Sequence, residues 1–164
     1  MTLADLINWL QDTPLSVTIR ESDWVFPTIE SIHVAAFVVV VGSISIVDLR
    51  LMGLASRSRR ADELIRELLP ITWSAFAIAA LAGALLFIGK PLTYTASFFF
   101  LGKMVLLLLA GLNMGAFHLF VHPRIAGPGD HAATPLAARA SGFVSLALWV
   151  GVVAFGRWIG FTTN

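Results

Sequence analysis

Residues 27–53 read PTIESIHVAAFVVVVGSISIVDLRLMG, and this stretch decides the fold. Residues 34–47 contain no charged side chain, and the apolar run is long enough to cross a bilayer, for which a helix needs about 20 residues. Polar residues stand toward the two ends, with Glu30 and His33 at one and Asp48 and Arg50 at the other. The stretch therefore predicts a membrane-spanning helix that carries ionisable groups.

The composition supports a membrane protein and excludes several other classes. Hydrophobic residues make up 57% of the chain and charged residues 13%, with a mean hydropathy of +0.83, outside the range of soluble domains. The absence of cysteine excludes disulfides, thiolate metal sites and covalently attached c-type haem. A net charge of +1 offers no basic surface, so nucleic acid is not an expected partner.

Four apolar segments have the length of membrane spans, at about residues 26–52, 68–89, 96–121 and 140–161. Their short connections predict an all-α, integral membrane, antiparallel four-helix bundle in one domain, residues 1–164. Residues 1–25 form an outer segment in which apolar residues recur at helical spacing. We expect a short interfacial helix there, lying on the lipid bilayer.

The arginines predict the orientation. Most basic residues fall in the connections between spans one and two and between spans three and four, which the positive-inside rule makes cytoplasmic. They are Arg50, Arg57, Arg59, Arg60, Arg66, Arg124 and Arg139. The predicted location is a bacterial cytoplasmic (inner) membrane, with several spans and both termini in the periplasm.

Two ionisable side chains lie at the same predicted depth. His33 is seven residues into the first span and Lys103 seven residues into the third, so each lies about 10 Å below the outer boundary. Charged groups inside a span are costly and indicate function. Both residues lie on stripes of three- and four-residue spacing that we expect to face the bundle interior. An imidazole and a neutral amine at one height predict a haem b iron site with His33 and Lys103 as metal ligands.

Two further residues complete the predicted cofactor site. Glu30, one turn outward of His33, is expected to bind the free ring nitrogen and fix the tautomer. Arg157, near the outer boundary of the fourth span, is expected to pair with the haem propionates. Structural roles stay open for the two ligands: His33 bonded to a neighbouring carbonyl or to Glu30, and Lys103 reaching the lipid headgroups.

A second polar cluster is predicted near the cytoplasmic end. Asp48 and His118 lie about 33 Å from the outer face, so His118 is too deep to share one iron with His33. The simpler interpretation is a structural network with Arg50, and a proton-uptake or quinone site is the alternative. His118 and His122, four residues apart, also have the spacing of metal ligands on one helix face.

Two segments carry a resemblance: IESIHVAAFVVVVGSISIVDLRLMGLA (residues 29–55) and FFFLGKMVLLLLAGLNMGAFH (residues 98–118). The chain resembles a family of uncharacterised four-helix bacterial membrane proteins over nearly its whole length. More distantly, it is similar to HemJ-type protoporphyrinogen oxidases and to the membrane domain of CopD-type copper-resistance proteins. In the HemJ type a first-helix histidine and a lysine opening a later helix bind haem b, and these match His33 and Lys103. Glu30 and the extra N-terminal segment depart from that pattern.

Three functions follow as expectations. The first is a haem b protein acting in electron transfer or in haem or porphyrin redox chemistry, with quinone as partner. The second is a non-catalytic accessory subunit of a larger membrane respiratory or photosynthetic complex, or a homo-oligomer, because the chain has no soluble domain. The third is copper or small-solute transport, which the CopD resemblance implies. The sequence leaves open whether the protein is an enzyme.

Overall fold

The computed structural model describes residues 2–56, 58–125 and 135–162. Four long helices dominate this part of the chain: α3 (Val25–Leu51), α4 (Ala61–Gly89), α6 (Phe98–Ala116) with its π-helical continuation η1 (Phe117–Val121), and α8 (Leu136–Thr162). Each is long and apolar enough to cross a membrane. The described residues contain no strand. The all-α bundle with four candidate membrane spans is therefore confirmed.

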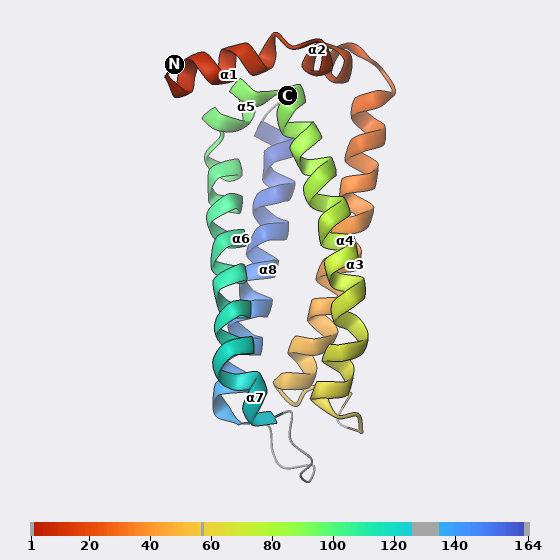
Figure 1. Cartoon of the computed structure of the whole chain (residues 1–164), viewed down its shortest axis with the longest axis vertical. Helices are drawn as coiled ribbons and strands as arrows, with labels where there is room; N and C mark the ends of the chain where they lie inside the picture. The colour runs from red at the N-terminus through yellow and green to blue at the C-terminus, as the bar shows by residue number, and fades with distance from the viewer. Residues whose placement is uncertain (1, 57, 126–134, 163–164) are drawn as a thin grey trace.

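The long helices form a bundle in which consecutive spans run antiparallel (Figure 1). α3 packs closely against α4 and α8, and α6 packs against α8. Within the described residues α4 and α6 lack comparable packing, although α4 contacts α5 at one end of the bundle and α7 at the other. The bundle is consequently less tightly closed between α4 and α6 than along its other sides.

Three short helices lie across one end of the bundle, α1 (Leu3–Gln11), α2 (Pro14–Glu21) and α5 (Pro91–Ala96), and this end is termed the capped end (Figure 1). α1 begins with a capping box between Thr2 and Asp5. α2 is fixed to the bundle because Ile19, only 2% exposed, packs against Gly89 of α4. The single interfacial helix that the sequence predicts is thus two helices, and α5 is an addition to the predicted fold.

The opposite end, where α7 (His122–Ile125) lies, is termed the arginine end (Figure 1). Its charges are largely paired: Arg59 contacts Glu67 at 2.7 Å, and Arg60 and Arg66 each contact the buried Asp62 at 3.1 Å. Residue 57 and residues 126–134 fall outside the described part of the chain, as does the side chain of residue 124. The cytoplasmic location of this end stays a prediction.

The spans differ from expectation mainly where they start. α4 begins at Ala61 rather than at residue 68, and α8 begins at Leu136 rather than at residue 140. The first turn of α4 contains Asp62 and Glu63, which favour a helix N-terminus but lower the local hydropathy. A span predicted from hydropathy therefore begins after the first turns of the helix. Pro70 therefore lies inside α4.

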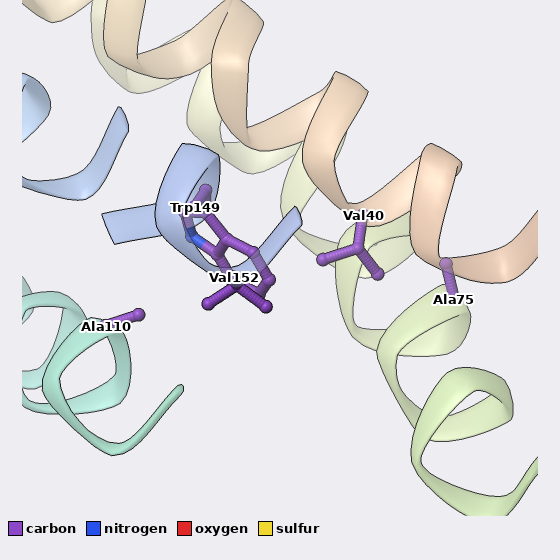
Figure 2. Close-up of a cluster of buried hydrophobic side chains, with 5 residues drawn as sticks. All are labelled: Val40, Ala75, Ala110, Trp149 and Val152. Carbon is purple, nitrogen blue, oxygen red and sulfur yellow. The ribbon is translucent and has the colours of Figure 1, made fainter. Parts of the chain in front are cut away.

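A hydrophobic core lies in the middle of the bundle and draws on all four spanning helices (Figure 2). Its buried residues are Val40 of α3, Ala75 of α4, Ala110 of α6, and Trp149 and Val152 of α8. Lipid chains are as apolar as this core, so close packing rather than exclusion of water stabilises it. Along α3, Val40 lies seven residues from His33 and eight from Asp48, and the core therefore separates two polar regions, each about 10 Å away.

Candidate functional site

The first polar region lies in the capped half of the bundle and is termed the His33–Lys103 layer; it comprises His33, Phe37, Gly83, Lys103 and Gly156. His33 is half-buried on α3, and its Nδ1 donates to the backbone carbonyl of Ala79 on α4 over 2.7 Å. A Cβ at Gly83 would lie 3.0 Å from His33 Cε1, so the absent side chain lets the imidazole lie against α4. With its proton on Nδ1, the ring keeps a lone pair on Nε2.

Lys103 reaches the same layer from α6. Its Nζ lies 5.3 Å from the ring centroid of Phe37, a cation–π geometry. Its side chain runs along Gly156 of α8, where an added Cβ would be 3.6 Å from Nζ. None of the ion pairs between described residues involves Lys103. The amine thus points into the bundle and contacts an aromatic face instead of a carboxylate.

Phe37 connects the two side chains. Its ring stacks on His33, with centroids 6.1 Å apart and planes at 17°, and it also packs against Trp149. The donor set of this layer suits haem b, because it offers an imidazole nitrogen held by a second-shell carbonyl and an unpaired amine. The Phe37 ring lies against both His33 and Lys103, so this ring has to move before a macrocycle can lie between them.

Glu30 and Arg157 do not join this layer. Both are exposed, and the Arg157 guanidinium lies 4.7 Å from the ring centroid of Phe161. In this structure the carbonyl of Ala79, and not Glu30, contacts Nδ1 of His33, and a role for Glu30 at a cofactor stays a prediction. Glu30 also acts on α5, where burial is the first cause, and the charge of Glu30 the second, of the raised pKa of Tyr94.

The second polar region is a cavity of about 190 Å³ in the half of the bundle next to the arginine end, termed the arginine-half cavity. All four spanning helices line it. Most of its wall is aliphatic or aromatic, and the polar lining residues are Asp48, Thr72, Asn113, His118, Ser141 and Ser145. Two of the residues that the sequence places in a cytoplasmic-side cluster, Asp48 and His118, thus line one cavity.

Polar atoms beside this cavity lack partners. Asp48 is 5% exposed, and its Oδ2 is buried without a hydrogen bond, as are Nε2 of His118 and Nε2 of His122. His118 Nδ1 donates to the carbonyl of Met114 over 3.0 Å, so its Nε2 carries a lone pair. Most buried polar side-chain atoms in proteins have partners, and each exception requires an explanation.

The π-helical segment η1 contains His118 and ends directly before His122. Their rings stack with centroids 5.6 Å apart, and His118 lines the cavity whereas His122 does not. Single π-helical turns inside α-helices frequently occur at functional sites. Among the described residues no three metal-ligating side chains of the histidine, cysteine and carboxylate types stand close enough to hold a metal ion. The histidine pair therefore has no third such ligand.

Sequence reasoning missed the residues that hold His33 and Lys103 in place. Ala79, Gly83 and Gly156 contribute a carbonyl and two gaps, none of which is a polar side chain. The signal was present as the small-residue run AALAGA at residues 79–84, because small residues allow close approach in membrane helices. Spacing alone does not identify such contacts: Gly111 and Gly115 are also four residues apart, but nothing in the described chain lies within 4 Å of an added Cβ at either.

Comparisons with known proteins give one match. A family model described as "Family of unknown function (DUF6644)" matches residues 7–162, almost the whole chain. No curated protein and no solved structure matches. The resemblance to the HemJ and CopD types therefore receives no support from these comparisons.

Proposed function

This chain belongs to the DUF6644 family, whose function is unknown, and we propose that it is a haem b-binding membrane protein of electron transfer or haem and porphyrin redox chemistry. The observation that carries this proposal is the hydrogen bond from His33 Nδ1 to the Ala79 carbonyl, which leaves Nε2 free in the layer that Lys103 enters. Metal-binding histidines commonly donate their other nitrogen to a carbonyl in this way.

In this proposal His33, Lys103 and Phe37 of the layer, and Ala79 beside it, have separate roles. His33 would supply the Nε2 lone pair and Lys103 its neutral amine, while Ala79 orients the imidazole. Phe37 would rotate away from His33 to admit the macrocycle, which the stacked ring now prevents. Haem b, when bound, supplies one-electron transfer. The remainder of the bundle excludes water from the layer.

The test is the absorption spectrum of the purified protein, reduced minus oxidised, after expression with added haem precursor. We expect a haem spectrum for the wild type and its loss in His33→Ala and Lys103→Met. Lys90→Met is the matched control, because Lys90 also lies over a phenylalanine, with Nζ 5.0 Å from the Phe26 ring centroid, but in the capped end. His118→Gln is the control for removal of a histidine.

Two outcomes would reject the haem proposal. One is a folded wild-type protein without a haem spectrum. The other is equal haem content in the wild type, His33→Ala and Lys103→Met. Phe37→Ala sharpens the test, since it removes the ring that now fills the space, and we expect at least equal haem occupancy in this variant.

A second candidate function is that of an accessory subunit in a larger membrane complex. The observation that favours it is the uncovered pair Gly111 and Gly115 on α6, because such glycines allow a second helix to approach closely. Gentle extraction from native membranes should then show co-migration with a larger assembly, which Gly115→Leu should disrupt. Migration solely as a monomer would reject this function. Nothing in the described residues favours copper or solute transport.

A further inference from the structure

We propose that the arginine-half cavity binds the single-ring head group of a membrane quinone. This site is separate from the His33–Lys103 layer, because the core of Val40, Ala110 and Trp149 lies between the two regions. The proposal depends on the size of the cavity, on its unpartnered polar atoms and on the side from which it opens. It does not depend on haem binding.

The volume of the cavity limits its ligand to one ring. An apolar cavity of about 150 Å³ inside a protein binds benzene, whereas pockets for larger organic molecules occupy about 300–1,000 Å³. At about 190 Å³ the arginine-half cavity admits a six-membered ring with small substituents. A haem macrocycle exceeds this volume.

The polar atoms match the oxygens of a quinone and of its hydroquinone. His118 Nε2, which carries a lone pair and has no partner, accepts a hydrogen bond from a hydroquinone hydroxyl. Asp48 Oδ2 is also unpartnered, and in the protonated acid form it donates to a quinone carbonyl. Asn113 needs no ligand, because its amide nitrogen donates to the Ser141 carbonyl and its Oδ1 accepts from the Ser141 hydroxyl. An apolar pocket with a few convergent polar groups is the usual form of a small-molecule site.

The cavity opens toward lipid between α4 and α6. Trp73 and Phe76 of α4 line it and are nevertheless 47% and 38% exposed, and Gly111 of α6 is an exposed lining residue. Since α4 and α6 are not closely packed, the isoprenoid chain of a quinone has a path out of the bundle. A water-soluble ligand would have to cross the apolar wall.

The experiment uses the purified full chain in detergent micelles and a benzoquinone with a saturated alkyl tail. Trp73 and Trp149 line the cavity, so binding should quench tryptophan fluorescence to saturation. An alkylbenzene with the same tail and no oxygen atoms serves as competitor. We expect the alkylbenzene to reverse the quenching only at a concentration at least tenfold above that of the quinone, because it leaves His118 and Asp48 without partners.

Two variants and one control locate the site. His118→Gln should weaken quinone binding at least tenfold, whereas His122→Gln should leave it unchanged, because His122 also has an unpartnered Nε2 but does not line the cavity. Gly111→Leu should weaken binding to a similar extent by filling the mouth. An added Cβ at Gly111 meets nothing within 4 Å, so this variant keeps the fold even if His118→Gln does not.

The proposal is overturned if the alkylbenzene reverses the quenching at a concentration equal to that of the quinone, which would mean that the cavity holds a hydrocarbon chain. Quenching without saturation, or wild-type affinity in folded Gly111→Leu, would overturn it as well. His33→Ala should bind quinone like the wild type. A wild-type protein that lacks haem but binds quinone would reject the haem proposal alone, whereas one that contains haem but does not bind quinone would reject this proposal alone.

Discussion

The His33–Lys103 layer and the arginine-half cavity lie on opposite sides of one core but treat buried polar atoms differently. In the layer, Nδ1 of His33 has a carbonyl partner at 2.7 Å and the Lys103 amine lies over an aromatic ring. Beside the cavity, the buried Asp48 Oδ2 and His118 Nε2 have no partner. The layer is filled by the Phe37 ring, whereas the other half retains a cavity.

This difference predicts opposite consequences for stability. A hydrogen-bonded buried group contributes about 1 kcal/mol to the folded state, whereas an unpartnered one costs about 1–3 kcal/mol. Substitutions in the layer should therefore destabilise the protein, and apolar substitution beside the cavity should stabilise it. A site that costs stability without a ligand indicates a role in binding.

The largest expected effect comes from Gly142 of α8, at a point where this helix packs closely against α3. An added Cβ there would lie 3.0 Å from the backbone carbonyl oxygen of Asp48 and 3.2 Å from Cβ of Leu51. We expect Gly142→Leu to lower the free energy of unfolding by about 3 kcal/mol, measured by denaturing-detergent titration. Gly160→Leu is the control, with nothing within 4 Å, and should change it by less than about 0.5 kcal/mol. Equal effects would show that α8 does not pack on α3 as described.

The next effect has the opposite sign. Asp48→Leu removes the unpartnered Oδ2 together with the hydrogen bond between the carboxyl group and Ser145. The cost of the unpartnered oxygen exceeds the contribution of that one bond, so the substitution should raise the free energy of unfolding by about 1–2 kcal/mol in the same titration. Asp48→Asn keeps a polar atom without a partner, so its free energy of unfolding should stay close to that of the wild type. Destabilisation by Asp48→Leu would mean that the hydrogen bond to Ser145 outweighs the cost of the unpartnered Oδ2, and the contrast between the two regions would disappear.

A smaller loss is expected when the layer is disturbed through Gly83. The methyl group of Gly83→Ala would lie 3.0 Å from His33 Cε1 and displace the ring from the Ala79 carbonyl, at a cost of about 1 kcal/mol. Gly42→Ala on α3 meets nothing within 4 Å and should instead gain up to about 1 kcal/mol from helix propensity. A gain in both variants would contradict the close contact between His33 and α4.

The smallest effect concerns Tyr94, the single tyrosine of the chain, at the capped end. Burial and the charge of Glu30 raise its pKa above the ordinary 10.0. As the pH rises, Tyr94 ionises in the unfolded chain before it ionises in the folded protein. Its contribution to stability is therefore complete below pH 10 and is lost as the pH rises through the folded-state pKa. Ultraviolet titration of tyrosinate should show this shift, reduced in Glu30→Gln. An unchanged titration in Glu30→Gln would place the carboxylate away from α5.

Hydropathy predicted the four spans because bilayer thickness fixes their length, and the structure gives helices at all four places. The starts of α4 and α8 were late by one to two turns, since charged first turns such as that with Asp62 lie outside an apolar window. The short helix α5 was missed because Pro91 begins it within a stretch that reads as a loop. The split of the N-terminal segment into α1 and α2 was missed in the same way, at Pro14.

The candidate sites were predictable only in part. Helical rise and spacing suggested that His33 and Lys103 approach each other and that Asp48 and His118 belong together, because both follow from position along a helix. The partners of these residues could not be predicted from position along a helix. A carbonyl such as that of Ala79, and a gap such as that at Gly83, depend on which faces of two helices meet. The cavity could not be predicted for the same reason, because its volume depends on how the side chains of four helices pack together.

The uneven packing around the bundle has a mechanical consequence. α3 and α8 form the seam that joins two helix pairs, α3–α4 and α6–α8, so the pairs can part on the α4–α6 side while the seam stays intact. Lateral pressure from the surrounding lipids acts directly on that movable side. We therefore expect a thicker or less fluid host membrane to slow the exchange of ligands between the bundle interior and the bilayer.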